Sequence, residues 1–144
     1  MSDVSQPGND SSIEDSEILY LRVFPSNVTS KDCPPGEYRP TSGAFRRDEA
    51  LSVDLASKST MELTCLRAGG AAFHVAVFTA AVARKQDCRV RRDPLLDNDA
   101  HAVVIGNHKY DTGAMSKSQM SQIAKQARIV CWDARFPRES YLGK

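Results

Sequence analysis

The sequence predicts a small α+β domain, with a mixed or antiparallel sheet of four or five strands and two or three helices. Short segments rich in β-branched and aromatic residues alternate with a few capped helical segments, and no internal repeat or heptad pattern is visible. At 144 residues, with 41% apolar and 26% charged side chains, the chain has the size and composition of one soluble globular domain. A domain of this size buries enough surface to fold without a disulfide.

The predicted strands are short segments of alternating or continuous apolar character. In the first, residues 18–24, every second side chain is a Leu or Val that faces the core, which leaves Arg22 on the other face. In the second, residues 50–55, the same alternation puts Ser52 and Asp54 outward. Further strands are expected at residues 73–78, 88–92 and 101–106.

Two short helices are expected in the middle of the chain. Ser59 or Thr60 caps the first, which ends at Gly69-Gly70, and Thr79 caps the second, which covers residues 80–86. One continuous helix from residue 73 onward is the alternative. We prefer a strand followed by a helix, because Val and Phe favour strands and Thr is a better cap than a helix interior residue.

The last helix has the strongest pattern. Ser116 and Gln119 form a capping box, and the residues that follow place an apolar stripe on one face that continues through Val130 to Cys131. We expect this face to pack on the sheet.

Charge divides the chain into a leader and a folded body. The first 18 residues hold five acidic side chains and no Lys or Arg, so the remainder carries a net charge of +6, although the whole chain carries only +1. Residues 1–16 have little to bury and predict a disordered acidic leader, and residues 17–144 predict a single globular domain. Solubility is the expected role of the leader, and the alternative is that it covers a basic surface of the body.

The best candidate for a binding site is a turn of small and hydroxyl-bearing residues, Arg39 to Phe45. It ends a loop, residues 25–43, that contains four of the seven prolines. The turn precedes the strand at residues 50–55, so it is placed to form a pocket wall. We predict ligand contacts from Arg22 as an anion partner and from Thr41, Ser42 and His101 as hydrogen-bonding groups.

Catalytic and metal-binding motifs are weak. Ser42, Asp54 and His101 are the residue types of a nucleophile, an orienting acid and a base, but no Gly-x-Ser-x-Gly motif surrounds Ser42. The four cysteines are widely spaced, and neither they nor His74 and His108 form the close pairs typical of ligand sets, so we expect no metal site. Whether the protein is an enzyme stays open at this point.

A basic cluster precedes and follows Cys88, and its members are Arg84, Lys85, Arg89, Arg91 and Arg92. Arg89 and Arg91 share one face of the predicted strand, where they can contact phosphate together. A charged edge strand explains the same residues, since charged side chains discourage edge-to-edge pairing. With a pI of about 7.7 and no aromatic residues among the arginines, nucleic-acid binding is the weaker interpretation.

Four segments of the chain look like those of a group of short, uncharacterised bacterial proteins. They are Leu19-Tyr20-x-Arg22, Arg39-Pro40-x-Ser42-x-Ala44-Phe45, Leu51-Ser52-Val53-Asp54 and Asp99-Ala100-His101-Ala102-x-Val104-x-Gly106. This resemblance spans residues 18–107 and implies no activity.

A looser resemblance is to ADP-ribosyltransferases, which pair an Arg on an early strand with a Ser/Thr-rich turn before another strand. It implies that Arg22 holds an NAD phosphate and that Thr41 and Ser42 support the nicotinamide side. The late Glu of those enzymes has no counterpart here, because no Glu lies between Glu62 and Glu139.

These observations together predict a small binding or accessory module. We expect a protein partner, no cofactor unless NAD binds under the alternative, and possible nucleotide binding at the Arg22 side. The N-terminus lacks the basic start and apolar stretch of a signal peptide, and residues 71–83 are too short and too polar to span a bilayer. A cytoplasmic location without membrane contact is therefore expected.

Overall fold

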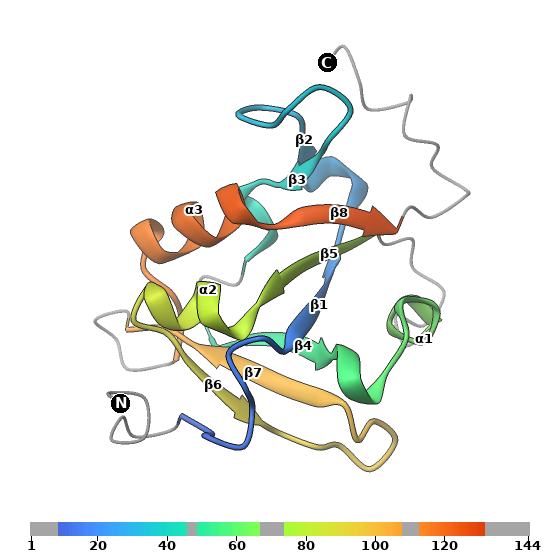
Figure 1. Ribbon diagram of the computed structural model, residues 1–144, viewed down its shortest axis with the longest axis vertical. Helices are drawn as coiled ribbons and strands as arrows, with labels where there is room; N and C mark the ends of the chain where they lie inside the picture. Colours follow the sequence, from blue (N-terminus) through green and yellow to red (C-terminus); the bar gives the residue numbers. More distant parts are fainter. Residues whose placement is uncertain (1–8, 46–48, 67–73, 108–112, 132–144) are drawn as a thin grey trace.

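Six strands form one antiparallel sheet in the order β6-β7-β4-β1-β5-β8. The computed structural model describes residues 9–45, 49–66, 74–107 and 113–131 (Figure 1). The strands are β1 (Ile18–Val23), β4 (Leu51–Leu55), β5 (His74–Thr79), β6 (Arg89–Arg92), β7 (His101–Ile105) and β8 (Arg128–Cys131). The expected α+β class and an antiparallel sheet are thus confirmed.

The core lies on one face of this sheet. Leu19 of β1 pairs with Leu55 and Phe78 on the two neighbouring strands, so the alternation expected from the sequence produces a continuous apolar surface. Helices α2 (Ala80–Lys85) and α3 (Lys117–Gln126) cover this surface, and Ile123 of α3 is fully buried. Helix α1 (Met61–Leu66) lies on the opposite side of the sheet (Figure 1).

The helices begin where the sequence predicts. The side chain of Thr79 accepts a hydrogen bond from the backbone of Val82, which caps α2. Ser116 and Gln119 form both hydrogen bonds of the capping box at the start of α3. Thr60 accepts a bond from the backbone of Leu63 in α1. The strand that precedes α2 is confirmed as well.

The prediction of four or five strands is wrong, because residues 128–131 contribute a sixth. The apolar stripe in the sequence of the last helix continues through Val130 and predicts a longer helix. In the structure α3 ends at Gln126, and Ala127 adopts an extended backbone. Ile129 then pairs with Ala76 of β5, and its N–H donates to the carbonyl of Tyr38. Burial of the β-branched Ile129 in the sheet outweighs the continuation of the helical pattern.

The long loop after β1 is ordered by short elements and one buried arginine. It contains the 3-10 helices η2 (Pro25–Asn27) and η3 (Ser42–Ala44), and the two-residue strands β2 (Val28–Thr29) and β3 (Arg39–Pro40) form a second, small sheet. Another 3-10 helix, η4 (Ala56–Lys58), follows β4. The Nε group of Arg39 donates to the carbonyl of Lys31 over 2.8 Å, which closes the loop.

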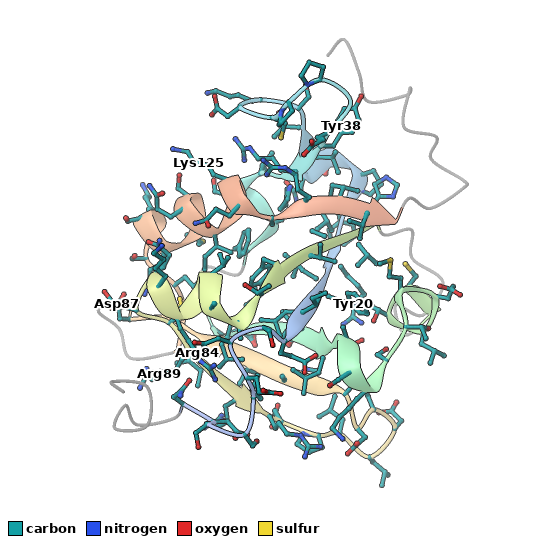
Figure 2. The ribbon with its side chains drawn as sticks, viewed as in Figure 1. Tyr20, Tyr38, Arg84, Asp87, Arg89 and Lys125 are labelled. Carbon is teal, nitrogen blue, oxygen red and sulfur yellow. The ribbon has the colours of Figure 1, made fainter. Side chains whose placement is uncertain are left out.

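The described part of the N-terminal region packs along the free edge of β6. Asp10 donates its N–H to the carbonyl of Val90 over 2.8 Å, and the side-chain oxygen of Asn9 accepts from the N–H of Val90. Ile13 is buried, and Asp15 forms an ion pair of 2.7 Å with Arg84. Figure 2 shows Arg84 beneath α2, toward this segment. Residues 9–17 therefore cover one cation of the basic cluster and occupy hydrogen-bonding groups of an edge strand.

Hydrogen bonds from Ser12 hold the pKa of the Asp10 carboxyl below its usual value, with a smaller contribution from Arg92. An acid whose pKa is lower in the folded state stabilises that state above its unfolded pKa. This contribution is lost as the pH falls through the folded pKa.

Gly106 follows β7 at a position where the packing leaves no room for a side chain. A Cβ atom at Gly106 would lie 2.3 Å from the Cα of Met115 and 2.5 Å from the carbonyl oxygen of Ala114. The backbone of residues 114–115 therefore packs directly on Gly106 before α3 begins.

Replacing Gly106 by Ala should destabilise the fold by more than about 2 kcal/mol, because the backbone itself must move to admit the methyl group. Urea denaturation measures this loss. Gly36→Ala is the control, since space is open there and the cost comes only from its positive φ of +84°, about 1 kcal/mol. A change below 0.5 kcal/mol for Gly106→Ala would contradict the close packing.

Candidate functional site

A hollow of about 310 Å³ lies where β1 and β4 meet the turn that follows β3. Among the described residues, three polar ones lie on its wall, namely Arg22, Asn27 and Ser52. The other described lining residues are Leu21, Phe24, Gly43, Ala44, Phe45 and Leu51. We call this the Arg22 hollow. A mostly apolar wall with a few polar groups is typical of sites for small molecules, and the volume is at the lower end of such sites.

Arg22 is held from behind by two oxygen atoms. Its Nη1 atom donates to the backbone carbonyl of Thr64 over 3.2 Å and lies 3.9 Å from Oδ2 of Asp54. The side chain keeps 26% of its surface exposed. Because a guanidinium group is planar, fixing one of its nitrogens restricts the direction of the others. Arg22 is thereby oriented in the wall of the hollow.

Asp54 is the buried centre of this arrangement, with a side chain only 1% exposed. Its Oδ2 atom accepts a hydrogen bond from the hydroxyl of Thr64, and its Oδ1 atom accepts one from the amide of Asn98, each over 2.8 Å. Burying a carboxylate is costly unless donors and a positive charge compensate it. Arg22, Thr64 and Asn98 provide that compensation.

The partners of Asp54 come from distant parts of the chain. Thr64 lies on α1, and Asn98 lies in the turn between β6 and β7, where it exchanges backbone hydrogen bonds with Leu95. The side chain of Asn98 also accepts from the N–H of Ala100 over 3.1 Å. One carboxylate therefore joins β4, α1 and the β6–β7 turn to Arg22 on β1.

The sequence pattern identified the face of Asp54 but not its burial. Alternation in β4 places Ser52 and Asp54 together on the face opposite the core, and Ser52 is indeed exposed. Asp54 is covered because α1 and the β6–β7 turn fold over that end of the strand. Thr64 and Asn98 were not among the predicted site residues, since an isolated Thr and Asn carry no spacing signal.

Thr41 and Ser42 line a different hollow, of about 190 Å³, on the side of the turn that faces α3. Its lining residues are Thr29, Lys31, Arg39, Thr41, Ser42, Ser121 and Ala124. We call this the Ser42 hollow. The turn is shared between the two hollows, since Gly43 to Phe45 line one and Thr41 and Ser42 line the other. The structure therefore does not bring Ser42 and Arg22 into one cavity.

His101 lies on neither wall. Its Nδ1 atom is 2.8 Å from the carbonyl oxygen of Asp93 and 3.2 Å from Oδ2 of the same residue. His101 is opposite Asp54 in the pairing of β4 with β7, but Ser42 lies beside α3. The candidate nucleophile, acid and base are thus not assembled as a triad.

Arg89 and Arg91 share a face of β6, as the alternation predicted, opposite Ile105 and Val103 of β7. The Nη2 atom of Arg89 donates to the carbonyl of Gly106 over 3.3 Å, whereas Arg91 is exposed. The two arginines are therefore in different surroundings, although they lie on the same face.

Cys88, which follows α2 in the sequence, is buried and has an unreactive thiol. Burial raises the pKa of the Cys88 thiol to about 12, so the reactive thiolate is scarce near neutral pH. Within residues 9–45, 49–66, 74–107 and 113–131, no three His, Cys, Asp or Glu side chains gather closely enough to hold a metal ion. His108 lies outside these residues.

Comparison with protein-family models, with curated proteins and with solved structures gives no match to this chain. Among the helices that the structure describes, none is long and apolar enough to cross a membrane. Function is therefore inferred from the two hollows and from the side chains that line them.

Thr64→Val keeps the side-chain shape but removes the hydrogen bond to buried Asp54. We expect a loss of roughly 1.5–3 kcal/mol in the free energy of unfolding, the usual contribution of a hydrogen bond to a charged group. Thr29→Val is the matched control, because its hydroxyl accepts only an exposed backbone bond from Lys31. Urea denaturation measures the free energy of unfolding of both variants. Equal losses in Thr64→Val and Thr29→Val would refute the claim that buried Asp54 needs the hydrogen bond from Thr64.

Proposed function

We propose that this protein is a small-molecule binding module whose ligand is an organic anion with an apolar body. The observation that carries the proposal is Arg22, a cation oriented by Asp54 and Thr64 in the wall of a mostly apolar hollow. The anionic group contacts the guanidinium, and the apolar body packs against Phe24 and Phe45.

The guanidinium of Arg22 has hydrogen-bond donors that no described residue uses. Among the described residues it makes hydrogen bonds only through Nη1, so Nε and Nη2 are left for a ligand. These two nitrogens form the edge that binds a carboxylate or phosphate in a bidentate manner. Asn27 and Ser52 add neutral hydrogen-bonding groups on the same wall. The combination favours recognition of one charged group within an otherwise apolar contact.

Among the described residues that line the hollow there is a cation but no carboxylate, imidazole or thiol. Asp54 is engaged by Thr64 and Asn98 behind Arg22. Binding is therefore better supported than a reaction. A protein partner and a cytoplasmic location, both expected from the sequence, remain part of the proposal and are not required by the geometry of the hollow.

The NAD-binding alternative is less well supported. It requires Arg22, Thr41 and Ser42 to contact one ligand, yet the first lines the Arg22 hollow and the other two line the Ser42 hollow. Thermal denaturation with millimolar NAD tests this alternative directly. A clear rise in Tm would favour it over a small organic anion.

Ser52→Phe should block the Arg22 hollow, because Ser52 is an exposed strand residue on its wall and Phe is well tolerated in strands. Phenylacetate serves as the probe, and two-dimensional NMR follows the backbone amides. We expect saturable shifts at Arg22, Phe45 and Ser52, and at least tenfold weaker binding in the variant.

Val130→Phe is the matched control, since it adds the same ring at an exposed position of β8 outside the hollow. Neutral 2-phenylethanol should bind much more weakly than phenylacetate. Equal affinity for the two probes would refute an anion site at Arg22. An equal loss of phenylacetate affinity in Ser52→Phe and Val130→Phe would refute it as well.

A further inference from the structure

The Ser42 hollow differs in chemistry from the Arg22 hollow. Among the described residues, four hydroxyl-bearing side chains, two cationic side chains and the apolar Ala124 line its 190 Å³, and none of these lining residues is a carboxylate. The hydroxyls belong to Thr29, Thr41, Ser42 and Ser121, and the cations are Lys31 and Arg39. Such a wall is suited to a compact ligand that is negatively charged and accepts many hydrogen bonds.

Arg39 is a buried cation whose charge is poorly compensated. Its side chain is only 9% exposed, and its Nε and Nη1 atoms donate to the backbone carbonyls of Lys31 and Pro40 over 2.8 and 2.9 Å. Among the described residues its ion-pair partner is Asp32, whose Oδ2 lies 3.9 Å from Nη2 and whose side chain is 58% exposed. Carbonyl oxygens satisfy the donors but carry no net charge, so an anion nearby is favoured.

The rest of the wall complements such an anion. Lys31 is exposed and free to direct its ammonium group toward the hollow, because no described side chain forms an ion pair with it. Hydroxyl groups rotate to donate or accept, so those of Ser42 and Ser121 can both donate to one ligand. The hydroxyl of Thr41 already donates to Asn27 over 3.3 Å, which fixes its position.

We propose that the Ser42 hollow binds a tetrahedral oxyanion, either free phosphate or the phosphate group of a monoester. Two cations and several hydroxyls around a small cavity match a group with a negative charge and several acceptor oxygens. The site does not depend on the Arg22 hollow, because the two hollows have no described lining residue in common.

Isothermal titration with inorganic phosphate at constant ionic strength tests the proposal. Lys31→Gln should weaken binding at least fivefold, whereas Lys85→Gln, which removes an equally exposed charge on α2, should leave it unchanged. Ser121→Glu places a carboxylate on the wall and should abolish binding. Gln122→Glu, one residue further along α3 and exposed, is its control for charge and for helix stability.

Three results would overturn the proposal. The first is no saturable binding at ten millimolar phosphate. The other two are an equal loss of phosphate affinity in Lys31→Gln and Lys85→Gln, or an equal loss in Ser121→Glu and Gln122→Glu. A parallel titration with O-phosphoserine distinguishes the source of the oxyanion. At least tenfold tighter binding assigns the hollow to a monoester, and equal or weaker binding assigns it to the free ion. Ser52→Phe should leave phosphate affinity unchanged, which separates this site from the Arg22 hollow.

Discussion

The buried carboxylate of Asp54 is the constraint on which the functional side of the molecule depends. A carboxylate that is 1% exposed needs donors and a counter-charge, and the chain supplies them from α1, from the β6–β7 turn and from β1. Each residue that contacts Asp54 also holds the helix, turn or strand on which it lies next to β4. The network therefore organises the face of the sheet opposite the core, where periodic apolar burial does not operate.

The same network determines what Arg22 can do. An arginine on a strand face ordinarily extends into solvent and samples many rotamers, at a cost in conformational entropy when it binds. Here Asp54 and the carbonyl of Thr64 restrict one end of the guanidinium before any ligand arrives. Stability and the proposed function are linked in this way, because the contacts that compensate Asp54 also orient the cation.

The elements of the fold could be predicted largely from local sequence. Alternation identified β1 and β4, and side-chain caps located α2 and α3, because these signals act within a few residues. The sixth strand could not be predicted, since the helical stripe continues through Ala127 to Val130 without interruption and only pairing with β5 distinguishes a helix from a strand there. Contacts of the N-terminal residues with Val90 and Arg84 are also long-range, and charge composition alone did not reveal them.

The candidate site could be predicted only in part. Residue type alone indicates Arg22 and the turn from Arg39 to Phe45, and both line cavities. The division of that turn between two hollows depends on how it packs on α3, which no spacing encodes. Thr64 and Asn98 became identifiable only when the sheet register and the β6–β7 turn placed them around Asp54.

A double-mutant cycle between Arg22 and Asp54 tests the central claim most directly. Arg22→Gln, Asp54→Asn and the double variant are compared by urea denaturation at neutral pH. If the buried carboxylate and the cation form one unit, the double variant should lose less than the two single losses added together, with a coupling energy of about 1 kcal/mol or more. Additive losses within about 0.3 kcal/mol would contradict the claim.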